Sequence, residues 1–242
     1  LVCVGTPSLE NGRLNQEYVL KVTGEIIEAL QEHPGPFIVL YRSTLEPGTM
    51  QKDIIPKFEK KLKGRMYQDI NVVYQPEFLR EGSAVRDFYA PGKTVLSGTS
   101  QSAIEAVLDL YQGNTGPVFE TDIKTAELVK MVDNIYHALK VSFGNEVGTF
   151  CHALGVNAHS LMDIFLADTQ LNISSKYLMP GKPFGGSCLP KELRSIKRYS
   201  LEMNLDLPVI NHILDSNTLR SEDVVRRIIK LGKKHVGFLG LS

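Results

Sequence analysis

The feature that most constrains the fold is a stretch that starts at Asp122 and contains no proline until Pro180. Asp122 is a suitable helix N-cap, and Gly155 can adopt the left-handed conformation that commonly ends a helix. The roughly 32 residues between them, at about 1.5 Å each, predict one helix about 48 Å long. Apolar residues occur on most of its sides, so we expect this helix to be buried between domains or against a second subunit.

The residues before the long helix alternate short β-branched runs with amphipathic stretches, a pattern typical of α/β units on a largely parallel sheet. We predict strands at 1–5, 37–41, 70–74 and 94–97, and helices at 16–32, 49–62 and 102–111. After the long helix we predict helices at 158–167, 191–202 and 208–231, followed by a closing strand at 234–242.

Composition excludes several function classes. Lys and Arg together number 27, as do Asp and Glu, so the chain lacks the basic surplus of a nucleic-acid-binding or polybasic membrane-surface protein. No apolar run reaches the ~18 residues needed to cross a bilayer. The three scattered cysteines suit neither a disulfide framework nor a zinc site, which favours a reducing, cytoplasmic setting. We expect no nucleic acid, membrane or metal partner.

A stripe of polar residues runs along the predicted long helix. Lys130, Asn134 and His137 are separated by four and then three residues, and Asn145 follows later on the helix. At this spacing they fall within a narrow angular sector of an otherwise apolar rod. Two interpretations remain open, a solvated helix face or a contact surface for an anionic or sugar-like ligand.

Cys188 lies within Phe184–Lys191, a segment whose two glycines permit a close backbone approach to a ligand. Pro190 suits the first turn of a helix, which would place Cys188 near a helix N-terminus and beside a lysine. Both influences lower the pKa of a thiol and favour a nucleophilic thiolate. The alternative is a buried structural cysteine, the interpretation that suits Cys3 and Cys151.

Polar residues also follow two predicted strands, as Arg42-Ser43-Thr44 and Gln75-Pro76-Glu77. Ligands of open α/β sheets bind at the carboxyl ends of strands. Glu77 and Glu81, four residues apart, could serve as a base for water or as hydroxyl ligands. The alternative is an ordinary loop in which Arg80 forms an ion pair.

Taken in order, these motifs resemble those of the UDP-glucose/GDP-mannose dehydrogenase family over nearly the whole chain. The matching segments are Val2–Ser8, Arg42–Thr44, Pro76–Gly82, the polar stripe with Asn145-Glu146, and Gly185–Lys191. The resemblance implies an α/β fold, with the second half of a Rossmann-like NAD domain followed by an all-helical central dimerisation domain. It divides the chain into residues 1–121 for the NAD domain, 122–216 for the dimerisation domain and 217–242 for the start of a nucleotide-sugar-binding domain.

The resemblance implies that a nucleotide sugar is oxidised at its C6 hydroxyl to a carboxylate, and that two NAD⁺ are consumed for each sugar. It also implies that the protein is a homodimer. Cys188 would attack the intermediate aldehyde to form a thiohemiacetal, whose oxidation leaves a thioester for water to hydrolyse. Lys130 and Asn134 would stabilise the developing oxyanion. Thr44, with Glu77 or Glu81, would position the hydrolytic water.

The family's other site positions are carried over in the same way. The implied NAD contacts are Thr6, Thr44 and Lys191, and the implied substrate contacts are Glu81, Lys130, Asn134, His137, Asn145, Tyr177 and Gly185. Glu192 stands where the family usually has an Asp, so a catalytic carboxylate is kept on a longer side chain.

Two patterns, Ser187–Lys191 and His137-Ala138-x-Lys140, resemble the GDP-mannose-specific members more than the UDP-glucose-specific ones. The expected reaction is therefore GDP-mannose to GDP-mannuronate, with UDP-glucose oxidation as the alternative. A rival of another class is a non-catalytic helical dimerisation module. The dinucleotide fingerprint GxGxxG is absent, so we expect the sequence to be part of a longer protein and to be inactive alone.

Overall fold

The computed structural model describes residues 1–11, 13–80, 82–174, 183–185 and 188–237. The chain divides into two compact units, Leu1–Tyr136 and His137–Ser242. The boundary falls within the long helix α5 (Ile123–Ala153).

The first unit is built on a four-stranded sheet with the strand order β1-β2-β3-β4. The strands are β1 (Phe37–Tyr41), β2 (Ile70–Tyr74), β3 (Thr94–Gly98) and β4 (Val118–Glu120). β1 pairs with β2 and β3 pairs with β4 in parallel, whereas β2 and β3 are antiparallel. The sheet is therefore mixed, and the antiparallel step was not predicted from the sequence.

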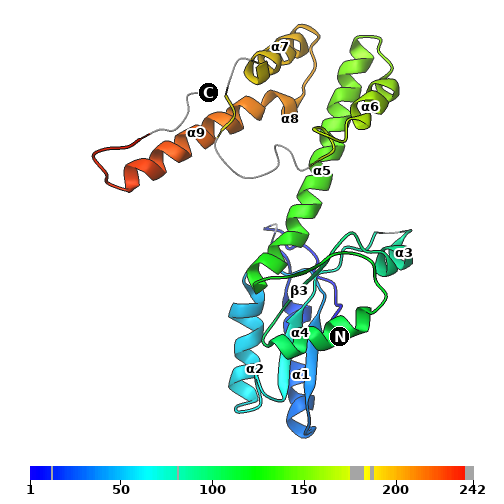
Figure 1. The fold of residues 1–242 in the computed structure, drawn as a ribbon, viewed down its shortest axis with the longest axis vertical. Coiled ribbons are helices and arrows are strands. Elements are labelled where there is room, and N and C mark those ends of the chain that lie inside the picture. Colours follow the sequence, from blue (N-terminus) through cyan, green and yellow to red (C-terminus); the bar gives the residue numbers. More distant parts are fainter. Residues whose placement is uncertain (12, 81, 175–182, 186–187, 238–242) are drawn as a thin grey trace. The chain divides into compact units, whose positions relative to one another are not determined.

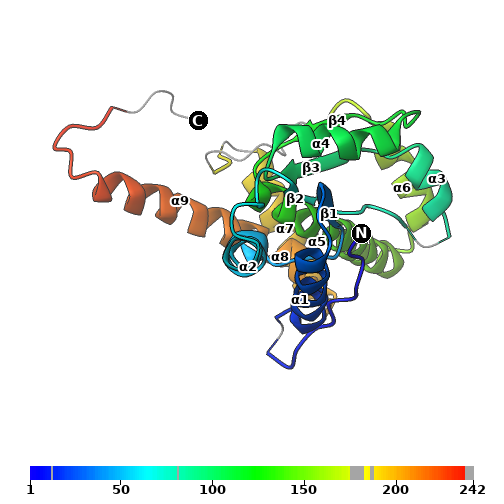
Figure 2. The ribbon, with the colours of Figure 1, turned by 90° about the horizontal axis from the view of Figure 1, so that it is seen from below.

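Alternating side chains of the strands pack into two separate cores, as expected for a sheet covered on both faces. On one face Tyr41, Val72 and Tyr74 join a core that also contains residues of α1 (Glu17–Glu32) and α2 (Ile55–Lys61). On the other face the strand residues Leu40, Val73 and Leu96 form a second core with α4 (Gln101–Leu108). Figure 1 shows these helices around the strands, and in Figure 2 α4 lies on the opposite side from α1 and α2.

Several predicted elements differ from the observed ones for local reasons. The expected strand at 1–5 is an isolated parallel bridge between Val2 and Tyr41. The expected helix at 49–62 is divided into a π-helical turn, η1 (Met50–Ile54), and α2. Pro56 lies at the start of α2 and has no N–H to donate, which interrupts a regular α-helical ladder there.

Other elements were predicted imperfectly because they are short. The expected helix at 102–111 is α4 followed by a 3₁₀ turn, η2 (Asp109–Tyr111). The sequence reading missed β4 and the six-residue helix α3 (Ala84–Tyr89). Elements of this length contain too few residues to show a hydrophobic period.

The long helix forms as predicted. The side chain of Asp122 accepts hydrogen bonds from the Thr125 N–H at 3.0 Å and from its hydroxyl at 2.5 Å, which caps the first turn of α5. Gly155 follows the helix with a φ of 68°, the left-handed conformation that glycine adopts without strain. Both ends of the helix therefore follow from side-chain chemistry visible in the sequence.

The second unit contains the remainder of α5 and the helices α6 (Ala158–Ala167), α7 (Cys188–Glu202), α8 (Pro208–Asn211) and α9 (Ile213–Lys230). Phe143 on α5 contacts Phe165 on α6, with ring centroids 6.1 Å apart. α7 packs against α8 and α9. The single helix expected at 208–231 is thus two helices. Of the closing strand expected at 234–242, residues 234–237 do not form a strand, and residues 238–242 lie outside the described residues.

Candidate functional site

The carboxyl ends of β1 and β2 form one side of a cavity of about 380 Å³. Its lining residues are 3–6, 42–44, Glu77 and Leu79. The cavity therefore contains three of the predicted site residues, Thr6, Thr44 and Glu77, although they are far apart in the sequence. This is the sheet edge at which α/β folds bind their ligands.

Two hydroxyl groups hold the first two chain segments of this cavity together. The hydroxyl of Thr6 donates a hydrogen bond to the carbonyl oxygen of Thr44 at 3.0 Å. The hydroxyl of Ser43 donates to the carbonyl oxygen of Val4 at 2.7 Å. Because each bond joins segments 38 or 39 residues apart, the segments beside the cavity have a fixed mutual position.

Lys130, on α5, reaches Glu77 in the segment that follows β2. Its Nζ atom lies 2.8 Å from Glu77 Oε1 and 2.5 Å from the Glu77 carbonyl oxygen. The other carboxylate oxygen accepts the N–H of Leu79 at 2.8 Å. Burial alone would raise the pKa of Glu77, but the hydrogen bonds from Lys130 and Leu79, with the charges of Lys130 and Arg42, hold that pKa below its usual value. Glu77 is therefore a carboxylate at neutral pH.

A second cation, Lys93, lies just before β3 and contacts the segment that follows β2. The ammonium groups of Lys93 and Lys130 lie 4.9 Å and 5.8 Å from the ring centroid of Phe78, within the range of cation–π attraction. Lys93 also forms an ion pair of 2.7 Å with Asp133, three residues beyond Lys130 on α5. The helix thus binds the connections before β3 and after β2 through charged side chains of both signs.

The cavity offers features that fit a polar ligand such as a dinucleotide. Among the described residues, the buried Nε of Arg42 has no hydrogen-bond partner. An added Cβ atom at Gly5 would meet no other atom within 4 Å, so a ligand has open access to the backbone there. An unpaired buried donor and an accessible backbone next to two hydroxyl groups are suitable for holding NAD.

The remaining predicted site residues do not line this cavity or lie outside the described residues. Asn134 follows Lys130 by one turn on α5 and is exposed, as are His137 and Asn145 in the second unit. Gly185 is exposed beside Phe184, whose backbone N–H and carbonyl oxygen both bond to Asn217 at 2.9 Å. Glu81 and Tyr177 lie outside the described residues, as do the side chains of Cys188, Lys191 and Glu192.

The backbone nevertheless tests one part of the cysteine prediction. α7 begins at Cys188, so this residue lies at a helix N-terminus as the sequence predicted, three residues earlier than the helix itself was expected. Cys151 is buried, but Cys3 is exposed, and its expected structural burial is wrong. The neighbouring Val2 is buried on the core face, and alternation along an extended segment turns Cys3 to the opposite side.

Glu127 is a charged residue of this region that was not predicted from the sequence, and the ion-pair partner of Arg80 was also not predicted. Glu127 is completely buried and accepts backbone N–H groups of Gly48 and Met50. The signal that could have indicated Glu127 was its position three residues before Lys130, in the same helix turn as Ala126, which is also buried. The ion pair expected for Arg80 is formed with Asp87, at 2.7 Å. Hydrogen bonds from Arg80 outweigh burial and hold the pKa of Asp87 well below its usual value.

Two absences apply to the part of the chain that the structure describes. No helix there is long and apolar enough to span a membrane. No group of three or more His, Cys, Asp and Glu side chains in that part could hold a metal ion.

Comparisons with known proteins agree with this geometry. Residues 1–115 match the NAD binding domain of the UDP-glucose/GDP-mannose dehydrogenase family, and residues 124–219 match its central domain. GDP-mannose 6-dehydrogenase from Pseudomonas syringae pv. tomato is 35% identical over 242 residues, which is 100% of this chain and 55% of that protein. UDP-glucose 6-dehydrogenase TuaD from Bacillus subtilis is 30% identical over 94% of this chain and 48% of that protein.

Solved structures give the same result. A ternary complex of GDP-mannose dehydrogenase from Pseudomonas aeruginosa has a TM-score of 0.95 and 34% identity, covering 99% of this chain and 55% of that one. A UDP-glucose dehydrogenase from Pyrobaculum islandicum has a TM-score of 0.65 and 29% identity, covering 95% of this chain and 51% of that one. The chain spans about half the length of these relatives, and it belongs to the UDP-glucose/GDP-mannose dehydrogenase family.

Proposed function

We propose that the whole protein is an NAD-dependent nucleotide-sugar 6-dehydrogenase that converts GDP-mannose to GDP-mannuronate. The observation that carries the proposal is the contact between Lys130 and Glu77. Lys130 lies in the region matched to the family's central domain, and Glu77 lies in the region matched to its NAD binding domain, beside the cavity. This contact brings an ammonium group and a carboxylate to the end of a sheet where a cofactor fits.

GDP-mannose is favoured over UDP-glucose by similarity. The GDP-mannose 6-dehydrogenases are 34–35% identical over the full chain, whereas the UDP-glucose enzymes reach 29–30%. The TM-scores of 0.95 and 0.65 favour the same choice. UDP-glucose 6-dehydrogenase activity is the alternative.

In the proposed mechanism, Thr6, Thr44 and Lys191 would hold NAD, which when bound would supply the hydride acceptor for each of the two oxidations. The thiolate of Cys188 attacks the sugar C6 aldehyde, and its sulfur–carbon bond gives a thiohemiacetal. Loss of hydride from that carbon and of the hydroxyl proton leaves a thioester. Water then adds to the thioester carbonyl, and the thiolate departs as the carboxylate forms.

Lys130 and Asn134 donate hydrogen bonds to the oxyanion that develops at C6 in these steps. The structure supports this role for Lys130, because its ammonium group is already fixed by two contacts to Glu77. Glu77, ionised by its low pKa, has no proton to donate at neutral pH. Its part in the mechanism is therefore to hold Lys130 and, with Thr44 and Glu81, to orient the hydrolytic water. Glu192 remains a further proposed catalytic carboxylate, and His137, Asn145, Tyr177 and Gly185 remain proposed substrate contacts.

The proposal is tested with the protein extended to the full length of its relatives. With GDP-mannose and excess NAD⁺ it should produce two NADH for each sugar oxidised, and Cys188→Ser should abolish formation of the carboxylate product. Parallel measurements of kcat/KM with UDP-glucose separate the two substrates. A Cys188→Ser enzyme with full activity would contradict the covalent mechanism, and preference for UDP-glucose would contradict the substrate assignment.

We also propose that the whole protein is a homodimer paired through α5. In this chain several large apolar side chains of α5 are exposed, although the sequence predicted that the helix is covered. The exposed fractions are 47% for Leu128, 51% for Val132, 65% for Ile135 and 47% for Leu139. A second copy of the helix would remove these side chains from water.

A further inference from the structure

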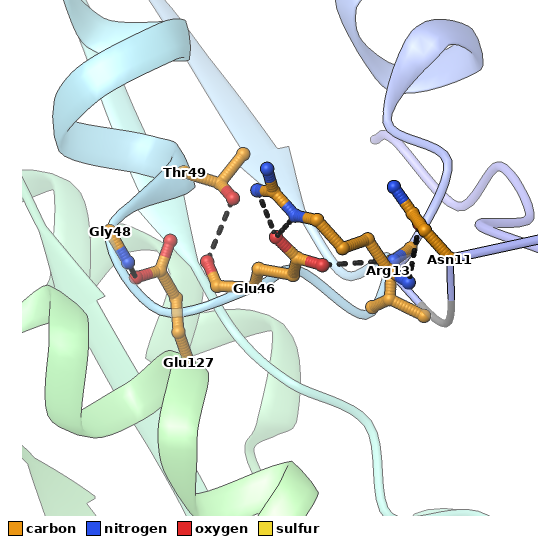
Figure 3. A network of polar contacts seen from close by, with 7 residues as sticks. Asn11, Arg13, Glu46, Gly48, Thr49 and Glu127 are labelled. Carbon is orange, nitrogen blue, oxygen red and sulfur yellow. Dashed lines mark hydrogen bonds and ion pairs between the residues drawn. The ribbon is translucent and has the colours of Figure 1, made fainter. Parts of the chain in front are cut away.

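Glu127 is a carboxylate with no exposed surface, bound to backbone groups far away in the sequence. It accepts the N–H of Met50 at 2.8 Å and also the N–H of Gly48, which lie 77 and 79 residues away. Figure 3 shows its contact with Gly48, whose positive φ of 98° is a conformation that favours glycine. Among the described residues Glu127 forms no ion pair, so these N–H groups are its principal polar partners.

A carboxylate in this environment is costly to bury. Burial raises the pKa of Glu127, and the hydrogen bonds from Met50 and Gly48 and the charge of Lys124 only partly oppose that effect. A neutral apolar side chain would avoid the penalty of desolvating a charge. The residue therefore stabilises one particular backbone position rather than simply filling the core.

The backbone that Glu127 holds is the Thr44 segment, defined here as residues 42–50. Its buried side is fixed by Glu127, and on its other side Glu46 accepts the N–H of Leu14 at 2.9 Å and pairs with Arg13 at 2.6 Å. The Arg13 contact is largely exposed, so it contributes little. Figure 3 shows both attachments, with Glu127 reaching Gly48 of the segment from α5, and Glu46 of the segment reaching Arg13.

Glu127 and Lys130 are one turn apart on α5, so a single rigid element contacts both strand ends. Glu127 binds the Thr44 segment after β1, while Lys130 binds Glu77 after β2. The helix thereby holds the Gly48–Met50 end of the Thr44 segment in a fixed position relative to the Lys130–Glu77 pair. We propose that Glu127 is a positioning residue that places Thr44 for NAD binding; this inference rests on the proposed role of Thr44 as a cofactor contact.

The test measures NADH binding to the full-length enzyme by fluorescence titration, which requires no sugar substrate. Glu127→Gln keeps the shape of the side chain but leaves one N–H facing an amide donor, and we expect NADH to bind roughly tenfold more weakly. Glu127→Ala should weaken binding further. Glu127→Asp keeps the charge on a shorter side chain and provides a second measurement if the alanine variant does not fold.

Thr23→Val is the matched control. Thr23 is also completely buried in the same core, where its hydroxyl bonds to the Val19 carbonyl oxygen and the Tyr41 hydroxyl, neither of which belongs to the Thr44 segment. Both substitutions should lower the melting temperature, and only Glu127→Gln should raise the Kd for NADH. Equal Kd values in the two variants at similar melting temperatures would show that Glu127 acts on stability alone.

A double-mutant cycle tests whether Glu127 affects NADH binding through Thr44. If Glu127 acts through Thr44, Glu127→Gln should weaken NADH binding much less in a Thr44→Ala background than in the wild type. Fully additive effects would overturn the proposed route. Oxidation of GDP-mannose is assayed separately, so an enzyme that binds NADH normally but leaves this sugar unreacted would contradict the proposed function and leave the positioning result intact.

Discussion

At the scale of single residues, Glu77 shows how a site can be anticipated while its electrostatics are not. Sequence reasoning selected Glu77 and Lys130 separately, from a strand end and a helix stripe. It could not pair them, because 53 residues separate them and only the packing of α5 beside β2 brings them within 2.8 Å. The contact converts two candidate residues into one ion pair whose charges stabilise each other.

This ion pair predicts how stability depends on pH. The folded pKa of Glu77 is lower than its ordinary value of 4.5, so the stabilisation it provides is present above that pH and is lost as pH falls through the folded pKa. The difference in unfolding free energy between wild type and Glu77→Gln should therefore be largest near neutral pH and shrink under acid conditions. Urea unfolding at a series of pH values measures it.

Lys130→Met is the control for this prediction. Without the lysine, burial of Glu77 is opposed mainly by the Leu79 N–H and by Arg42, so the pH dependence due to Glu77 should weaken. The same pH dependence in the Lys130→Met protein would contradict the assignment of the low pKa to this pair. Because Glu77 is partly exposed, the effect should not exceed about 1 kcal/mol.

At the scale of secondary-structure elements, the reliable predictions were those in which the sequence shows both a hydrophobic period and a residue that marks the end of the element. α1 and α5, and the strands β1, β2 and β3, lie within a few residues of their predicted positions. The antiparallel direction of β3 was missed because strand direction depends on how the connecting segment crosses the sheet, which hydrophobic alternation does not encode. Helix α7 was predicted to start at Lys191 but begins at Cys188, which places Pro190 within its first turn, a position that suits proline.

Substitution of two glycines by alanine should change the free energy of unfolding in opposite directions. Gly24 lies inside α1, and a Cβ atom there would meet nothing within 4 Å. Gly24→Ala should therefore stabilise the protein by about 0.5–1 kcal/mol, because alanine loses less backbone entropy in a helix. Thermal or urea unfolding of the full-length protein provides the measurement, and a destabilised Gly24→Ala variant would contradict the observed space around α1.

Gly116, which lies just before β4, is the glycine at which alanine should destabilise the protein. A Cβ atom at Gly116 would lie 2.0 Å from the carbonyl oxygen of Pro91, and a backbone atom cannot move aside as a flexible side chain can. Gly116→Ala should destabilise the protein by more than about 2 kcal/mol.

At the scale of the whole molecule, two faces of α5 present different kinds of side chain. Lys130 and Glu127 contact Glu77 and Met50, which lie in the region matched to the family's NAD binding domain. The exposed apolar residues Leu128, Val132, Ile135 and Leu139 recur at intervals of four, three and four, so they form one stripe. Val132 is two residues beyond Lys130, about 200° around the helix, which places the stripe nearly opposite the lysine. Pairing along this stripe would leave the Lys130 contact with Glu77 uncovered.

This separation leads to a prediction about assembly. Ile135 is 65% exposed and lies within the stripe, so Ile135→Glu would place a charge in a buried seam if two copies pair there. The full-length wild type should sediment as a dimer and Ile135→Glu should shift toward monomer at the same concentration, as measured by analytical ultracentrifugation. Val85→Glu is the control, because Val85 is 75% exposed on α3, away from α5 in the sequence. Dimers that persist in Ile135→Glu, or that dissociate equally in Val85→Glu, would contradict pairing through α5.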